Sequence, residues 1–192
     1  MDNSLPFFSI IIPVFNGVNN GLSRCLNSIW KQNLEESLYE VICIDDCSTD
    51  STWDYLQQQC NEHRNLIIRH NQANIRQGAS RNIGVKIAKG DYILFLDSDD
   101  YYHPDSLSKI HSHLQSIDLE VLVNDSTYQF GCFEHNKLQL NYKFTEVTDG
   151  ETFILKNWYA CAPWRLTIKR SFFLQNDLFL SKAIESRILT GG

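Results

Sequence analysis

Short, nearly continuous apolar runs alternate along this chain with segments in which apolar residues recur every three or four positions. The runs are rich in Ile, Val, Leu and Phe, a composition typical of strands that are buried on both faces of a sheet. We therefore expect strands at residues 8–15, 39–46, 65–70, 91–97 and 120–125.

The segments between these runs predict amphipathic helices. Their apolar positions are Leu22, Cys25, Leu26, Ile29 and Trp30, then Trp53, Leu56 and Cys60, then Ala79, Ile83 and Ile87, and last Leu107, Ile110, Leu114 and Ile117. Ser48 or Thr49 is suited to cap the second helix. Gly90 is placed to end the third helix, and Pro104 to open the fourth. Strands that alternate with helices indicate βαβ units, and hence an α/β fold with an open, mostly parallel sheet flanked by helices.

Beyond residue 125 the regular alternation fades. Residues 126–144 alternate loosely and predict antiparallel strands along one edge of the sheet, while residues 150–158 predict a short helix. Residues 160–173 are apolar and aromatic, so we expect a short antiparallel or irregular C-terminal portion. Because no linker, repeat or low-complexity segment divides the sequence, we predict a single domain over residues 1–192.

Charge and cysteine content narrow the class of protein. Lys and Arg total 17 against 23 Asp and Glu, for a net charge of −6, and no basic run is present, which argues against a nucleic-acid partner. The longest apolar stretches are shorter than the roughly 20 residues that span a bilayer, and the first residues lack a basic segment, so we expect neither a membrane span nor a secretory signal. The cysteines show no C-x-x-C spacing and are expected to be reduced core residues of a cytoplasmic protein; they are Cys25, Cys43, Cys47, Cys60, Cys132 and Cys161.

Acidic residues directly follow two of the predicted strands. Asp45 and Asp46 end one strand, and Asp97, Asp99 and Asp100 follow another within the sequence DSDD. Neighbouring carboxylates disfavour one another's charge, so the cluster needs hydrogen-bond donors, water or a bound cation. Parallel strands bring these acids to the same edge of the sheet, where ligands bind in open α/β folds. The alternative is that the acids serve only as turn residues or helix caps.

A metal is the most direct explanation for this acidic edge. The first strand is followed by PVFNGVNNGLS, which contains neither a dinucleotide-binding glycine motif nor a P-loop. An acidic edge can still hold a phosphorylated substrate through a divalent cation, because Mg²⁺ and Mn²⁺ bind carboxylate and phosphate oxygens together. The sequence therefore predicts a cofactor site for Mn²⁺ or Mg²⁺.

Three stretches, taken in order, resemble the family 2 glycosyltransferases. They are SIIIPVFN, VICIDDCSTDST and NQANIRQGASRNIGVKIAKGDYILFLDSDD. The resemblance covers residues 8–117, with a weaker similarity at APWRLTIKRSFF, and it implies a GT-A fold, the nucleotide-diphospho-sugar transferase fold. It also divides the chain into a nucleotide-binding half at residues 8–117 and an incomplete acceptor-side half at residues 118–192.

The resemblance assigns expected roles to seven residues. Asp99, the last acid of the D-x-D triplet, would ligate the divalent metal on the sugar-nucleotide diphosphate. Asp97 and Ser98 of the same triplet would face the ribose or the metal-bound diphosphate. Asp46 would accept a hydrogen bond from N3–H of uracil or thymine. The residues that would line the base pocket or lie near the nucleotide are Pro13, Phe15 and Arg81, with pairing to a nearby acid as the alternative for Arg81.

The activity that the resemblance implies is a metal-dependent, inverting transfer of a sugar from a nucleotide diphosphate donor to a hydroxyl acceptor. We expect a UDP-sugar as donor, with thymidine and guanosine nucleotides left open, and a glycan or lipid-linked sugar as acceptor in polysaccharide or surface-glycan synthesis. The cytoplasm, or the inner face of the membrane, is the expected location. The alternatives are a non-catalytic nucleotide-sugar-binding fragment and a metal-dependent nucleotidyltransferase, although the basic glycine-rich loop typical of the latter is missing.

The sequence departs from the family pattern in two places. Arg76 stands where a glycine is common in the N-x-G stretch. The catalytic Asp or Glu of similar proteins lies shortly beyond the segment that resembles KRSFFLQNDLFL, but here Glu185 is the only acid after Asp177 and its context does not match. We therefore expect a chain truncated at its C-terminus, with Glu185 as a weak candidate for the base.

Overall fold

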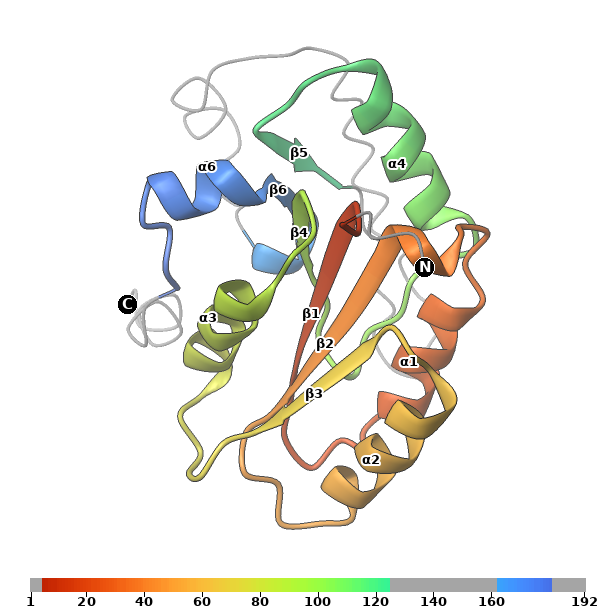
Figure 1. Ribbon diagram of the computed structural model, residues 1–192. Coiled ribbons are helices and arrows are strands. Elements are labelled where there is room, and N and C mark those ends of the chain that lie inside the picture. Colours follow the sequence, from red (N-terminus) through yellow and green to blue (C-terminus); the bar gives the residue numbers. More distant parts are fainter. Residues whose placement is uncertain (1–4, 125–161, 181–192) are drawn as a thin grey trace, which may run out of the picture.

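The computed structural model describes residues 5–124 and 162–180 (Figure 1). The elements are, in chain order, β1 Phe8–Val14, α1 Leu22–Trp30, a 3-10 helix at Glu36–Leu38, β2 Tyr39–Asp45, α2 Thr52–Glu62, β3 Leu66–His70, α3 Gln77–Ile87, β4 Tyr92–Phe95, α4 Ser106–Ser116, β5 Val121–Val123, a 3-10 helix at Pro163–Arg165, β6 Leu166–Lys169 and α6 Arg170–Gln175. The alternation of strands and helices predicted for the first part of the chain is confirmed. The predictions for residues 126–144 and 150–158 lie outside the described residues.

The described strands form one sheet in the order β3-β2-β1-β4-β6-β5. β1, β2, β3 and β4 pair in parallel, whereas β6 pairs antiparallel with both β4 and β5. The sheet is thus mostly parallel with a short antiparallel C-terminal portion, as the sequence predicts. The antiparallel strand, however, is inserted between β4 and β5 rather than added outside them.

Side chains of the central strands alternate between two hydrophobic cores. Ile10 and Ile12 of β1 pack with residues of α1, α2 and α4, whereas Ile11 between them packs with residues of α3 and α6. Accordingly, α1, α2 and α4 lie on one side of the sheet and α3 and α6 on the other (Figure 1). Both faces of the sheet are covered, which explains why β1, β2 and β4 are apolar at almost every position.

The chain reverses its direction across the sheet between β1 and β4. From β1 it builds outward through β2 to β3 and then returns to add β4 on the opposite side of β1. The pairing of β1 with β4 ends at Ile11 and Phe95, where Leu96 N donates to Ile11 O at 3.1 Å. Pro13 is the next residue of β1 whose amide would face β4, and proline has no N–H. The two strands therefore separate at their carboxyl ends, where such a switch point forms a ligand-binding crevice.

Three predicted helix boundaries are wrong. α4 begins at Ser106 with Asp105 as its N-cap residue, so Pro104 does not open it. α2 begins at Thr52 and its N-cap residue is Ser51, so neither Ser48 nor Thr49 caps it. α3 ends at Ile87 and is followed by Ala88 in an extended conformation, so Gly90 does not end this helix. Gly90 instead lies against β1, where an added Cβ would come within 2.6 Å of the backbone of the first two residues of that strand. Close approach of two backbone segments, rather than a helix end, is the reason for this glycine.

The cysteines of the described residues are free. Cys25 and Cys43 are buried in the core, and burial raises the pKa of both thiols above its usual range. Cys47 and Cys60 are half-buried, so the expectation of core positions holds for the first pair alone. In residues 5–124 and 162–180, no helix is long and apolar enough to cross a membrane.

Candidate active site

A cleft of about 340 Å³ lies at the switch point between β1 and β4. It is lined by Pro13, Val14, Phe15, Asn20, Asp46, Gln77, Ser98 and Asp99. Five residues that the sequence assigns to the nucleotide or the metal are in this set, and they come from the ends of three different strands. The fold therefore gathers Pro13, Phe15, Asp46, Ser98 and Asp99 into one site, as the predicted sheet requires.

Asp46 is a buried carboxylate held by the loop between β3 and α3. Its side chain is 3% exposed, and its Oδ1 accepts hydrogen bonds from Asn71 Nδ2 and from Ile75 N, both at 2.9 Å. Its Oδ2 accepts a further bond from Arg76 N at 2.8 Å. A carboxylate offers about four acceptor positions, so these three donors leave one for a ligand. The carboxylate is thus fixed in place at the edge of the cleft.

The backbone conformation of Arg76, the first departure from the family pattern, shows why a glycine is common at this position in similar sequences. Its φ of 77° and ψ of 158° lie in a region that glycine adopts readily and other residues rarely do. This conformation turns the Arg76 amide toward Asp46, and the same requirement accounts for the glycine that is common here in similar sequences. Arg76 therefore occupies a strained position within the site.

The loop after β1 is fastened to the loop after β2. Asn16, with a φ of 52°, donates its N–H to Ser48 Oγ at 2.9 Å, and its side-chain Oδ1 accepts from Thr49 N at 2.8 Å. Thr52 Oγ1 accepts a hydrogen bond from Gly17 N at 2.8 Å. Ser48 also donates to the fully buried Asp45. The hydroxyl groups of CSTDST therefore position the loop that carries Phe15. They have this role instead of the helix capping that the sequence predicts.

Arg81 and Asp97 form an ion pair beside the cleft and are not among the residues that line it. Arg81 is 5% exposed, and its Nη2 donates both to Asp97 Oδ1 and, at 3.1 Å, to Gln77 Oε1. The alternative reading of Arg81, pairing with a nearby acid, is the arrangement that the structure has. Through this guanidinium the loop after β4 is connected to the first turn of α3.

The acids at the end of the D-x-D sequence are exposed. Asp99 contributes its backbone oxygen to a 2.7 Å hydrogen bond from Arg24 Nη2, whereas its carboxylate accepts none from the described residues. The pKa of Asp100 is raised, first by partial burial and then by the charges of Asp97 and Asp99, while Arg24 lowers it. Negative charge is therefore accumulated here without full compensation.

The donor set at this loop fits a cation that is shared with a phosphorylated ligand. Within residues 5–124 and 162–180 no group of three or more His, Cys, Asp and Glu side chains could hold a metal by protein ligands alone. Mg²⁺ and Mn²⁺ commonly need only one or two carboxylates when phosphate oxygens and water complete the shell. The carboxylate of Asp99, exposed in the cleft and without a hydrogen-bonding partner among the described residues, has the chemistry that such a shared site requires.

The comparison with protein families agrees with this geometry. The model of glycosyl transferase family 2 matches residues 9–175. This chain belongs to glycosyltransferase family 2. The match covers every residue of the cleft and both members of the ion pair between Arg81 and Asp97.

Relatives of this family 2 chain include two poly(ribitol-phosphate) glycosyltransferases. The poly(ribitol-phosphate) beta-glucosyltransferase of Bacillus spizizenii is 45% identical over 100 residues, which are 52% of this chain and 16% of that protein. The poly(ribitol-phosphate) beta-N-acetylglucosaminyltransferase TarS of Staphylococcus aureus is 33% identical over 117 residues, which are 60% of this chain and 20% of TarS. The chain thus spans a minor part of the length of these two relatives.

Solved structures of S. aureus TarS 1-349 share the fold. The complex with UDP matches with a TM-score of 0.77 and 28% identity, covering 94% of this chain and 52% of that one. The complex with UDP-GlcNAc matches with a TM-score of 0.76 and 29% identity, covering 90% of this chain and 48% of that one. These likenesses confirm the predicted GT-A fold.

Three residues of the cleft, Val14, Asn20 and Gln77, were not predicted. Asn20 follows Asn16 by four residues, in the turn before α1, and donates its amide to Asn16 O at 2.6 Å. Gln77 is the first residue of α3 and lies between the N-x-G position and the SRN motif. Val14 and Gln77 lie within stretches that resemble the family, but no role was assigned to them, and the folded loops bring all three residues to the cleft. Glu185, the weak candidate for the base, lies outside the described residues.

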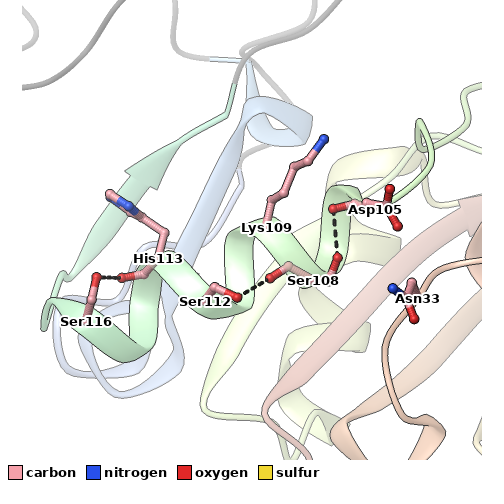
Figure 2. A pocket seen from close by; sticks show the side chains of 7 residues that line it. All are labelled: Asn33, Asp105, Ser108, Lys109, Ser112, His113 and Ser116. Atoms are coloured by element: carbon pink, nitrogen blue, oxygen red, sulfur yellow. Dashed lines mark hydrogen bonds between the residues drawn. The ribbon is translucent and has the colours of Figure 1, made fainter.

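A second depression, of about 620 Å³, lies away from the cleft along α4. Figure 2 shows that its serines stand in a row on the helix. Ser108, Ser112 and Ser116 each donate to a carbonyl oxygen three or four residues earlier, at 3.0, 2.9 and 2.7 Å. Because these hydroxyl groups are bonded to their own helix and do not converge, we assign no chemistry to this depression.

Proposed function

We propose that this family 2 chain binds a UDP-sugar in the cleft between β1 and β4 and transfers the sugar to a hydroxyl group of a glycan or lipid-linked acceptor. The observation that carries the proposal is the meeting of Phe15, Asp46 and Asp99 in one cleft at the switch point of the sheet. An aromatic ring, a fixed acceptor and a free carboxylate correspond to the base, its N–H and the diphosphate with its cation.

The nucleobase is placed on the side of the cleft formed by the loops after β1, β2 and β3. Phe15 is 47% exposed, unusual for so large an apolar ring, and a stacked base would cover it. Pro13 forms the buried floor beside it. Asp46 has one acceptor position left, which suits the N3–H of uracil.

The diphosphate is placed on the side formed by the loop after β4. Asp99 would hold the Mn²⁺ or Mg²⁺, with Ser98 beside it in the cleft and Asp97 toward the ribose. When bound, the cation stabilises the negative charge that develops on the departing nucleoside diphosphate. A carboxylate must also take the proton of the acceptor hydroxyl as it attacks the sugar with inversion. Glu185 is the candidate that the sequence offers for this step.

The acceptor class is inferred from relatives. Two relatives are named for glucosyl and N-acetylglucosaminyl transfer to poly(ribitol-phosphate), and one solved relative is complexed with UDP-GlcNAc. These relatives support a UDP-hexose or UDP-N-acetylhexosamine donor and a hydroxyl-bearing polymer as acceptor.

Calorimetric titration tests the donor site. UDP, dTDP and GDP are titrated into the protein with and without Mn²⁺, and the same series is run with Asp99→Ala. We expect UDP to bind, Mn²⁺ to tighten binding at least about tenfold, and Asp99→Ala to abolish that gain. Asp91→Ala is the matched control, because Asp91 is an exposed acid at the opposite end of the same strand region, and we expect it to leave binding unchanged.

Three results would contradict parts of the proposal separately. If no nucleotide binds to the folded protein, the donor site is wrong. If UDP binds equally well with and without Mn²⁺, the role of Asp99 is wrong while the base site stands. If UDP-sugar binds but neither transfer nor slow hydrolysis of the donor is detected, the chain acts as a nucleotide-sugar-binding module, the alternative that the sequence left open.

A further inference from the structure

The orientation of the Gln77 side chain follows from its neighbour. Arg81 Nη2 lies 3.1 Å from the Gln77 amide, and a guanidinium has donors only. The oxygen of the amide must therefore face Arg81, which leaves its NH₂ group as the free end. Since Gln77 lines the cleft, this NH₂ group is a hydrogen-bond donor available to a ligand.

Gln77 is also fixed in relation to Asp46. The N–H of Arg76, the residue directly before Gln77, donates to Asp46 Oδ2 at 2.8 Å. That same oxygen holds the acceptor position left for a ligand, because Oδ1 already accepts from two donors. The same cleft thus presents a carboxylate acceptor and an amide donor, and both belong to groups held by other hydrogen bonds.

We infer that Gln77 determines base specificity by donating a hydrogen bond to the C4 carbonyl oxygen of uracil, next to the N3–H that Asp46 accepts. This inference rests on the proposed function. Uracil offers an N–H flanked by two carbonyl groups, which matches an acceptor beside a donor. Cytosine has a ring nitrogen acceptor and an amino donor at the corresponding positions, so it would set acceptor against Asp46 and donor against Gln77. The pair therefore selects UDP over CDP.

The test is the ratio of dissociation constants for CDP and UDP, measured for the wild type and for Gln77→Glu. The substitution keeps the shape of the side chain and its contact with Arg81, but it replaces the donor with an acceptor. Any repulsion between the new charge and the diphosphate cancels in the ratio, because both ligands carry the same diphosphate. We expect the wild type to favour UDP and the variant to lose about tenfold or more of that preference.

Two further variants complete the design. Gln72→Glu places the same charge on an exposed residue of the same loop that does not line the cleft, and we expect an unchanged ratio. Gln77→Leu removes the donor without adding charge, and we expect a smaller loss of preference; it also serves if Gln77→Glu does not fold. Thermal unfolding checks that each variant is folded.

The outcomes separate the two proposals. A wild type that binds UDP in preference to CDP, with the ratio unchanged in both Gln77 variants, overturns the role of Gln77 and leaves the proposed function intact. A wild type that binds CDP as well as UDP overturns the inferred base recognition. A folded wild type that binds no nucleotide contradicts the proposed function and with it this inference.

Discussion

The two sides of the cleft differ in how their acids are held: the proposed base side carries Pro13, Phe15, Asp46 and Gln77, and the proposed diphosphate side carries Ser98 and Asp99. Asp46 accepts three hydrogen bonds and is almost fully buried. The carboxylate of Asp99 is exposed and accepts none from the described residues. Two acids that look alike in the sequence thus stand in opposite physical situations.

This difference shows what each side requires from its ligand. A neutral base is recognised through hydrogen bonds, which are directional, so its acceptor must be held in place before the ligand arrives. Ordering that acceptor beforehand lowers the free-energy cost of binding. A diphosphate with its cation is held mainly by charge, and the cation can take oxygen ligands from a mobile donor set. We therefore expect substitutions on the base side to change the free energy of unfolding and those on the diphosphate side to leave it nearly unchanged.

The largest effect is expected for Asp46→Ala. Removing the carboxylate leaves the amides of Ile75 and Arg76 and the side chain of Asn71 without their acceptor, and unsatisfied donors cost about 1–3 kcal/mol each where water cannot reach them. Because two of the three are partly accessible, we expect a loss of about 2–3 kcal/mol in unfolding free energy and a Tm lower by about 5–10 °C. Thermal and urea unfolding measure it.

Asp99→Ala is the counterpart of that variant on the diphosphate side. Its carboxylate is exposed and makes no hydrogen bond with the described residues, so we expect a change within about 0.5 kcal/mol in the same unfolding experiments. Equal losses for Asp46→Ala and Asp99→Ala would show that the two sides are equally ordered and would remove the basis of the comparison.

For Arg76→Gly we expect an effect that is smaller than that of Asp46→Ala and opposite in sign. A non-glycine residue in this backbone region lowers the free energy of unfolding by about 1–3 kcal/mol. Glycine relieves this strain, but part of the gain is lost because glycine gives the unfolded chain a larger conformational entropy. We expect a net increase of about 1 kcal/mol in unfolding free energy. Arg76→Ala is the control, because it removes the same charged side chain but keeps Cβ and hence the strain. A gain in both variants would mean that the side chain, not the backbone, is destabilising.

The parts of the site that were predictable are those in which one residue type meets a local requirement. Ile-rich runs identified the central strands, and acids directly after β2 and β4 identified the edge of the sheet where Asp46 and Asp99 meet. Pro13 meets a local requirement of the same kind, because a proline in a central strand cannot donate to the neighbour that its nitrogen faces, here β4, while the pairing with β2 continues to Val14. In each case the residue type that the local fold requires is also the one that the expected chemistry of the site requires.

The parts that were not predictable depend on pairings between distant segments. β6 lies between β4 and β5 through backbone pairing with both strands, and its four residues, LTIK, do not indicate which strands they will pair with. Ser48 resembled a helix cap, since a hydroxyl group after a strand is suited equally to capping and to holding Asn16. Gln77 lies within a stretch that resembles the family but was assigned no role, and the role we infer for it depends on its contact with Arg81 in the folded chain.

The smallest effect is expected for Asp100→Asn and concerns pH. Burial and the charges of Asp97 and Asp99 raise the pKa of Asp100 in the folded chain above its ordinary value, so on raising the pH from about 4 the unfolded chain loses this proton first. Ionisation of Asp100 therefore lowers the stability, and this cost is complete once the pH exceeds the folded pKa. Asp100→Asn removes the cost, and because Asp100 is exposed and screened by solvent we expect a gain of no more than about 0.5 kcal/mol at pH 7, shrinking toward pH 4. Unfolding measured from pH 4.5 to 7 in the presence of a chelator checks it; a gain that is the same at every pH, or a loss at pH 7, would show that the acids after β4 do not repel one another in the absence of the cation.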